Sequence, residues 1–163
     1  FAAGDAFLPE LVMAGEAMKS AVAVLEPELM KTGAARKTLG KVVMATVEGD
    51  IHEIGKSLVG TMLAASGFTV FDMGVDVATS RIIAKVKEVD ADIVAMSSLL
   101  TTSMGAMKDT MRAITAAGLR DKVKVMVGGA PITRDWADKI KADGTSEDAI
   151  GAVQLAKKLV GKE

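Results

Sequence analysis

The composition is informative first for what it lacks. The 163 residues include no cysteine, no tyrosine and a single histidine, and the aromatic side chains are four phenylalanines and one tryptophan. A chain without cysteine cannot form a disulfide framework, a thiolate metal site or a cysteine nucleophile. Nucleic-acid binding normally needs a basic surface and stacking rings. The formal net charge of −1 and the scarcity of aromatic residues therefore argue against such a partner.

Hydrophobic residues are numerous but are not gathered into long runs. They make up 50% of the chain, beside 25% charged residues, which is typical of a globular protein with a buried core. No apolar run reaches the roughly 18 residues that cross a bilayer, and no signal peptide opens the chain. We therefore expect a cytoplasmic protein with no membrane partner. The first residue is Phe1, not methionine, so we also expect the native start to be absent.

The spacing of apolar residues divides the chain into two parts. Over residues 1–33, apolar side chains such as Leu11 and Leu25 recur at helical spacing. One amphipathic helix cannot bury its own face, so this segment must pack on the rest of the chain, on further helices or on a partner. A polar, glycine-containing stretch at 32–40 is the expected linker to the second part.

The second part alternates between strand and helix patterns. Strands are expected at 41–47, 68–73, 93–97, 123–127 and, short and polar, 142–145, with helices at 55–66, 80–89, 103–117, 133–142 and 147–160. Three of the strands are nearly continuous apolar runs, which is typical of strands covered on both faces. Gly67 and Gly118 follow two of the helices, where a left-handed cap is favoured. The pattern predicts an α/β fold with a doubly wound, five-stranded parallel sheet.

Three segments with unusual residues directly follow expected strands. The segment 50–55, Asp-Ile-His-Glu-Ile-Gly, follows the first strand and holds the only histidine, His52. Residues 97–99 close the third strand, and Gly128–Gly129 follows the fourth. In an open parallel sheet, ligands bind outside the carboxyl ends of the strands, where the strand order reverses. We therefore expect these three segments to meet at one edge of the sheet.

The chemistry of His52, taken alone, is open. A protein zinc site needs three or four ligands, and this chain has no second histidine and no cysteine. In a serine hydrolase, Asp50 would orient His52, and Ser97, Ser98 or Ser103 would be the nucleophile. No Gly-x-Ser-x-Gly elbow holds any of these serines, however. A metal that arrives inside a macrocycle would need only one axial ligand, with Asp50 hydrogen-bonded behind it. His52 could equally be an ordinary surface residue at a helix start.

Other glycine and methionine signals are also ambiguous. An isolated pair such as Gly128–Gly129 most often makes a tight turn. No Gly-x-Gly-x-x-Gly follows the first strand, which disfavours a nucleotide-binding fold. The 11 methionines are most simply core residues, although flexible thioethers also suit a broad apolar ligand.

Taken together, the three segments resemble a known signature. The order is Asp50-x-His52-x-x-Gly55, 41 residues, Ser97-x-Leu99, 28 residues, and Gly128-Gly129. It is similar to the cobalamin-binding signature of corrinoid-dependent methyltransferases and mutases. Residues 7–19 look like the end of the helical cap that precedes this domain in methyltransferase corrinoid proteins, and they do not resemble the segments that flank it in mutases. The resemblance covers essentially the whole chain.

The resemblance implies a division into domains and a binding mode. Residues 1–35 would be a partial helical cap module, and residues 40–163 a flavodoxin-like or Rossmann-like cobalamin-binding domain. The corrinoid would bind base-off, with His52 as the lower ligand of cobalt. Asp50 would be hydrogen-bonded to His52, and Ser103 to Asp50, so that these three residues support the methyl transfer. The other cofactor-binding residues implied are Gly49, Ile51, Glu53, Gly55, Ser97, Leu99, Thr101, Gly128, Gly129 and Ala149.

The family also implies a function for the chain. It would shuttle a methyl group through Co(I) and methyl-Co(III), and would not be catalytic alone. The methyl group would pass from a substrate-specific methyltransferase to a second one that uses coenzyme M or tetrahydrofolate. The donor would be methanol, a methylamine or a methoxylated aromatic, and a reductive activase could assist. A cobalamin-binding sensor, the cobalamin domain of a mutase and, outside this chemistry, a serine hydrolase are the alternatives.

Overall fold

A parallel sheet forms the centre of the computed structural model, which describes residues 7, 9–10, 13–17, 20–21, 24–25 and 38–162. The strand order is β2-β1-β3-β4-β5, with every pairing parallel. The strands are β1 (Lys41–Thr46), β2 (Thr69–Asp72), β3 (Ile93–Ser97), β4 (Lys124–Gly128) and β5 (Gly144–Thr145). The helices are α2 (Ile54–Ala65), α3 (Thr79–Val89), α4 (Met104–Ala116), α5 (Arg134–Lys139) and α6 (Ala149–Leu159).

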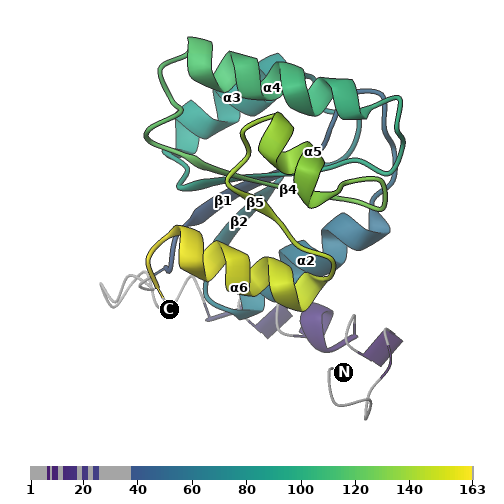
Figure 1. Cartoon of the computed structure of the whole chain (residues 1–163). Helices are drawn as coiled ribbons and strands as arrows, with labels where there is room; N and C mark the ends of the chain where they lie inside the picture. Colours follow the sequence, from purple (N-terminus) through teal and green to yellow (C-terminus); the bar gives the residue numbers. More distant parts are fainter. Residues whose placement is uncertain are drawn as a thin grey trace.

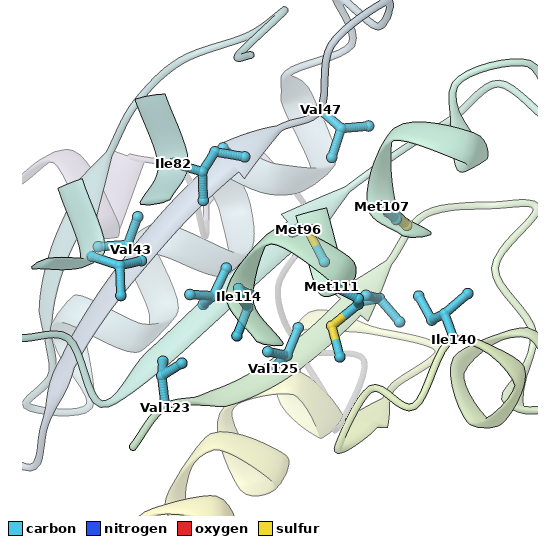
Figure 2. Close-up of a cluster of buried hydrophobic side chains, with 14 of the residues drawn as sticks. Val43, Val47, Ile82, Met96, Met107, Met111, Ile114, Val123, Val125 and Ile140 are labelled. Carbon is cyan, nitrogen blue, oxygen red and sulfur yellow. The ribbon is translucent and has the colours of Figure 1, made fainter. Parts of the chain in front are cut away.

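The helices cover both faces of the sheet (Figure 1). Helices α2 and α6 pack together on one face, the α2–α6 face, whereas α3, α4 and α5 lie on the other, the α3–α4 face. Alternate residues of β1 enter the two cores: Val43 belongs to the α3–α4 core, and Val42 and Met44 belong to the α2–α6 core. Figure 2 shows the first of these, in which Ile82 and Ile114 are fully buried. Each such side chain contributes about 1.5–3 kcal/mol by leaving water.

The fold class expected from the sequence is confirmed, with small differences at the ends of elements. Gly67 and Gly118 have positive φ angles, as expected of left-handed caps. Helix α5 is shorter than expected because Lys141 adopts a φ of 62°, which no helix can continue through. Helix α6 begins later than expected because the Asp148 carboxylate accepts the backbone N–H of Gly151 at 2.7 Å and caps it there.

The expected N-terminal helix lies largely outside the described residues, as do residues 32–37 of the expected linker. The described residues of 9–10, 13–17, 20–21 and 24–25 are helical. Gly15 is buried, and a Cβ at this position would overlap the methyl group of Thr61 on α2. Gly15 therefore lies directly against α2. Among the described residues, no helix is both long enough and apolar enough to cross a membrane.

Candidate functional site

The single histidine lies where the order of the strands reverses. The chain runs from β1 outward to β2, and then returns past β1 to β3, so the loops after β1 and β3 diverge at the carboxyl edge. Such a switch point is where open parallel sheets bind ligands. The loop after β1 carries Asp50 and His52, and the loop after β3 carries Leu99 and Ser103. The third expected segment adjoins the second, because the Ser98 N–H donates to the Gly128 carbonyl oxygen at 3.0 Å.

A buried carboxylate joins the loops after β1 and β3. Asp50 is fully buried. Its Oδ1 accepts the backbone N–H of His52 at 2.9 Å and lies 2.8 Å from the Nδ1 atom of the His52 ring. Its Oδ2 accepts the backbone N–H groups of Leu99 at 2.6 Å and Leu100 at 3.2 Å, and the hydroxyl of Ser103 at 3.0 Å. One side chain therefore ties the two loops together and orients the imidazole. The hydrogen bonds from His52 to Asp50 and from Ser103 to Asp50 are those that the resemblance implies.

The protonation state of Asp50 follows from these bonds. Burial alone would raise the pKa of the Asp50 carboxyl, because it disfavours the charged form. Hydrogen bonds from the backbone and ring of His52, the backbone of Leu99 and the hydroxyl of Ser103 outweigh burial and hold the pKa well below its usual range. An ionised carboxylate can only accept, so Nδ1 carries the ring proton. In the neutral imidazole with this tautomer, Nε2 keeps a lone pair that can bind a metal.

Exposed apolar side chains occur on both segments that Asp50 joins, next to His52 in the chain and at the start of the loop after β3. The side chain of His52 is 46% exposed. Ile51 and Ile54 are 75% and 81% exposed, and Leu99 and Leu100 are 42% and 39% exposed. We call these four residues the apolar rim. Large hydrophobic residues exposed together usually mark a binding surface. The rim and the exposed ring therefore suit a broad, largely apolar ligand that presents a metal.

A row of small side chains crosses the central strands beside this loop. Thr46 lies opposite Ser97, which lies opposite Gly128, at the carboxyl ends of β1, β3 and β4. By alternation with their buried neighbours, all three side-chain positions face the α2–α6 face. A Cβ added at Gly128, or at Gly55 in the first turn of α2, would meet no atom within 4 Å. These two glycines therefore leave room on that face.

Gly129 is required by the close approach of two backbone segments. Its φ angle is 128°, and a Cβ there would overlap the carbonyl oxygen of Ser98. Only glycine allows the backbone after β4 to approach the backbone after β3 so closely. Gly129 therefore shapes the edge of the sheet by close backbone approach, whereas Gly128 borders open space.

The remaining expected residues lie on the same edge or on the same face. Gly49 has a φ angle of 83°, and its N–H donates to the Asp76 carboxylate at 2.8 Å. Glu53 is the residue before α2, and Thr101 is exposed in the loop after β3. Ala149 is the first residue of α6, so it lies on the α2–α6 face and not in either loop around His52.

Sequence reasoning missed several partners of Asp50. The backbone N–H of Leu100 is one, and the hydroxyl of Ser98, which is 2.7 Å from that of Ser103 and 3.5 Å from Oδ2, is another. Ser98 and Ser103 are both buried and both point at Asp50 rather than at the imidazole. This is not the order of a catalytic triad, in which the serine contacts the histidine. The geometry therefore argues against the serine hydrolase alternative.

A metal site built by the protein alone is also not formed. Within residues 38–162 and the described residues before them, no three or more histidine, aspartate or glutamate side chains gather as metal ligands. His52 could therefore serve only a metal that brings its other ligands with it.

Comparisons with known protein sequences identify the domain. Residues 40–154 match the family model of the B12 binding domain. A dimethylamine corrinoid protein of Methanosarcina barkeri is 50% identical over 160 residues, which cover 98% of this chain and 75% of that protein. A corrinoid protein of Desulfitobacterium hafniense (strain Y51) is 48% identical over 160 residues, covering 98% of this chain and 74% of that one.

Solved structures agree with the sequence relatives. The monomethylamine corrinoid protein of Methanosarcina barkeri superposes with a TM-score of 0.73 at 41% identity, covering 98% of this chain and 74% of that one. A chain of the methanol:cobalamin methyltransferase complex from the same organism gives a TM-score of 0.88 at 29% identity, covering 98% and 60%. A response-regulator receiver domain from Mycobacterium tuberculosis, at 16% identity and a TM-score of 0.56, shares the fold alone.

Proposed function

Because the chain belongs to the corrinoid proteins and contains their B12 binding domain, we propose that it carries a methyl group on a corrinoid held by His52. The corrinoid is bound base-off, with the Nε2 atom of His52 as the lower ligand of cobalt. One observation carries the assignment of this ligand. The His52 ring is fixed at Nδ1 by a buried, ionised Asp50, while the side chain is 46% exposed and its Nε2 atom has no hydrogen-bond partner among the described residues.

The residues at this edge suit a corrinoid in three respects. A corrin ring supplies the equatorial ligands of cobalt, so one histidine is enough. The apolar rim supplies a surface on which a broad macrocycle can rest and lose contact with water. Gly55 and Gly128 leave room on the α2–α6 face for the nucleotide tail, with Ser97 between them and Ala149 at the margin.

The corrinoid, when bound, supplies the methyl-transfer chemistry, and the protein holds it in place. Asp50 keeps the imidazole in one tautomer and one orientation. The backbone N–H groups of Leu99 and Leu100 and the hydroxyl of Ser103 keep the Asp50 carboxylate ionised and fixed. The edge of the corrin ring is bordered by residues of the two loops, namely Gly49, Ile51, Glu53 and Thr101. None of these groups transfers a methyl group itself, so the chain acts as a carrier.

The partners belong to the same proposal. The methyl donor is handled by a substrate-specific methyltransferase, and the acceptor, coenzyme M or tetrahydrofolate, by a second one. Among the donors expected, the names of the relatives favour a methylated amine, since by superposition the monomethylamine corrinoid protein is 41% identical and the chain of the methanol:cobalamin methyltransferase complex 29%. Residues 1–35 are the end of a helical cap, which the close approach of Gly15 to α2 supports. A cytoplasmic location and a reductive activase complete the proposal.

The presence of one histidine makes the ligand directly testable. The protein is produced with nitrogen-15-labelled histidine and no histidine tag, and is then loaded with cobalamin in the cobalt(II) state. In its electron paramagnetic resonance spectrum, an axial nitrogen splits each cobalt line into a triplet when unlabelled and into a doublet when labelled. We expect doublets from the labelled protein, because His52 is the only histidine that can carry the label.

Two outcomes would contradict the assignment. Triplets from the labelled protein would mean that the tail base, which is unlabelled, remains on cobalt. No nitrogen splitting at all would mean that no protein nitrogen ligates the metal. As the matched control, His52→Ala should bind cobalamin more weakly and show no doublet.

The carrier role is tested separately by mixing the cobalamin-loaded protein with methylamine:corrinoid and coenzyme M methyltransferases. Turnover is expected to require the loaded chain. Turnover of the two enzymes without this chain, or none with it, would refute the role.

A further inference from the structure

Thr46 places a hydroxyl group inside the sheet at the foot of the ligand loop. It is the last residue of β1, and it is fully buried. The alternation of β1, with Val42 and Met44 in the α2–α6 core, places the Thr46 side chain on that same face, below the loop that enters α2. A buried hydroxyl needs a hydrogen-bond partner. The identity of that partner shows what the residue does.

The partner is the backbone of His52. The Thr46 hydroxyl donates to the His52 carbonyl oxygen at 2.9 Å. The other end of the same residue is held by Asp50, which accepts the His52 N–H at 2.9 Å. His52 is in neither a helix nor a strand, since α2 begins at Ile54. The side chains of Thr46 and Asp50 therefore fix the backbone of His52, which no helix or strand fixes.

The two contacts have different consequences. Asp50 lies two residues before His52 in the same loop and also accepts hydrogen bonds from the loop after β3, so its bonds orient the ring relative to these two loops. Thr46 belongs to a central strand that is paired on both sides, so its bond fixes the loop relative to the sheet. A site that must hold an atom within a fraction of an ångström depends on such support from a rigid element.

We propose that Thr46 is a positioning residue for the metal ligand: its hydroxyl anchors the His52 carbonyl to β1 and so sets where Nε2 stands above the sheet. This inference rests on the proposed function, because it takes His52 as the lower ligand of a corrinoid. It predicts that removing the hydroxyl weakens histidine ligation while leaving the tail contacts and the fold in place.

The chain offers well-matched variants for a test. Thr46→Val has the same shape without the hydroxyl, Thr46→Ala is a second hydroxyl-free variant, and Thr46→Ser keeps the hydroxyl. Thr110→Val is the control for loss of a buried threonine hydroxyl elsewhere. Thr110 is also fully buried, and its hydroxyl donates to the Ala106 carbonyl at 2.9 Å and lies 2.8 Å from that of Thr79, on the α3–α4 face.

The strength of ligation can be read by cyanide competition. Each variant is loaded with aquocobalamin, the bound cobalamin per chain is measured, and cyanide is added until the absorption spectrum becomes that of the dicyano form. The second cyanide must displace the lower ligand, so the concentration at half-conversion reports how firmly the protein holds cobalt. Circular dichroism melting of each apo protein reports the fold independently.

The expected result is a selective shift. Thr46→Val and Thr46→Ala should reach half-conversion at about a fivefold lower cyanide concentration, the effect of one lost hydrogen bond on an equilibrium. Thr46→Ser should stay near the wild type. Thr110→Val should melt at a lower temperature but keep the wild-type midpoint. Unchanged midpoints in both hydroxyl-free variants, an equal shift in Thr110→Val, or no rescue by Thr46→Ser would overturn the proposal.

His52→Ala separates the two hypotheses. Without a histidine to displace, it should have the lowest midpoint of all. A wild-type midpoint in His52→Ala would remove the proposed ligand and, with it, the basis of the proposed binding mode. A low midpoint in His52→Ala together with a wild-type midpoint in Thr46→Val would leave the ligand in place and reject only the role of Thr46.

Discussion

Replacing Asp50 by asparagine should cost the apo protein much of its stability. The amide has one accepting oxygen where the carboxylate has two. If that oxygen faces Leu99 and Ser103, the amide NH₂ faces the backbone N–H of His52, which loses its acceptor. A hydrogen bond to a charged group contributes about 1.5–3 kcal/mol, and a buried donor without an acceptor costs about 1–3 kcal/mol. We therefore expect the free energy of unfolding to fall by about 3 kcal/mol at neutral pH.

The size of this effect should depend on pH in a definite direction. The pKa of Asp50 is lowered in the folded protein, from about 3.9 in an unfolded chain. In acid below about pH 4 the unfolded chain therefore binds the Asp50 proton first, so the stability that Asp50 contributes is present above that pH. This contribution to stability is lost as the pH falls toward the lowered pKa that Asp50 has in the folded protein. The stability gap between wild type and Asp50→Asn should therefore narrow in acid.

The measurement is urea unfolding of both apo proteins, followed by circular dichroism between neutral pH and about pH 3. Asp109→Asn is the control, because Asp109 is exposed and its pairing with Arg112, at 3.2 Å, joins two surface side chains. Such pairs contribute about 0.2–1 kcal/mol at most. A loss below 1 kcal/mol for Asp50→Asn at neutral pH, or a gap that widens in acid, would refute the reasoning.

Three further predictions concern the same region. Gly129→Ala should lower the free energy of unfolding by about 2–3 kcal/mol, because the added Cβ meets the Ser98 backbone at a positive φ angle. Gly128→Ala should have the melting temperature of the wild type, and equal melting temperatures for the two variants would contradict this prediction. Ile54→Ser should leave the melting temperature unchanged, because Ile54 is 81% exposed, but should weaken cobalamin binding roughly tenfold in equilibrium dialysis; unchanged affinity would exclude Ile54 from the binding surface. Asp72→Ala should lower the free energy of unfolding by about 3 kcal/mol in urea, because it leaves the buried Lys56 ammonium with only the longer contact, at 3.8 Å, to the exposed Glu53. Adding Lys56→Met should restore most of that stability, and no recovery would show that the ion pair is not the cause.

The sheet could be predicted because strands that are buried on both faces are nearly continuous runs of apolar residues. The runs that became β1, β3 and β4 are apolar almost throughout, and Gly67 and Gly118 ended their helices at the positive φ angles expected of them. The end of α5 could not be predicted. It depends on a left-handed Lys141, a residue type with no preference for that conformation.

The candidate site was partly readable for a similar reason. His52, Asp50 and Ser103 are side chains with distinctive chemistry, and their spacing resembles that of a known family. The backbone N–H groups of Leu99 and Leu100, which fix the Asp50 carboxylate, have no sequence signature because every residue except proline carries one.

The bonds to Asp50 also limit how this site could be moved to another protein. Residues 48–55, transplanted alone onto another doubly wound sheet, would bring the histidine together with a buried carboxylate whose donors at residues 99, 100 and 103 had been left behind. Burial would then act on Asp50 without its compensating bonds, so the acid would tend to keep its proton and the ring would lose its orientation. A designer must therefore transplant the loops after β1 and β3 as one unit, together with a glycine at the position of Gly129 so that the second loop can be approached. The smallest portable version of this site is the two loops together with Gly129 after β4 and Thr46 at the end of β1.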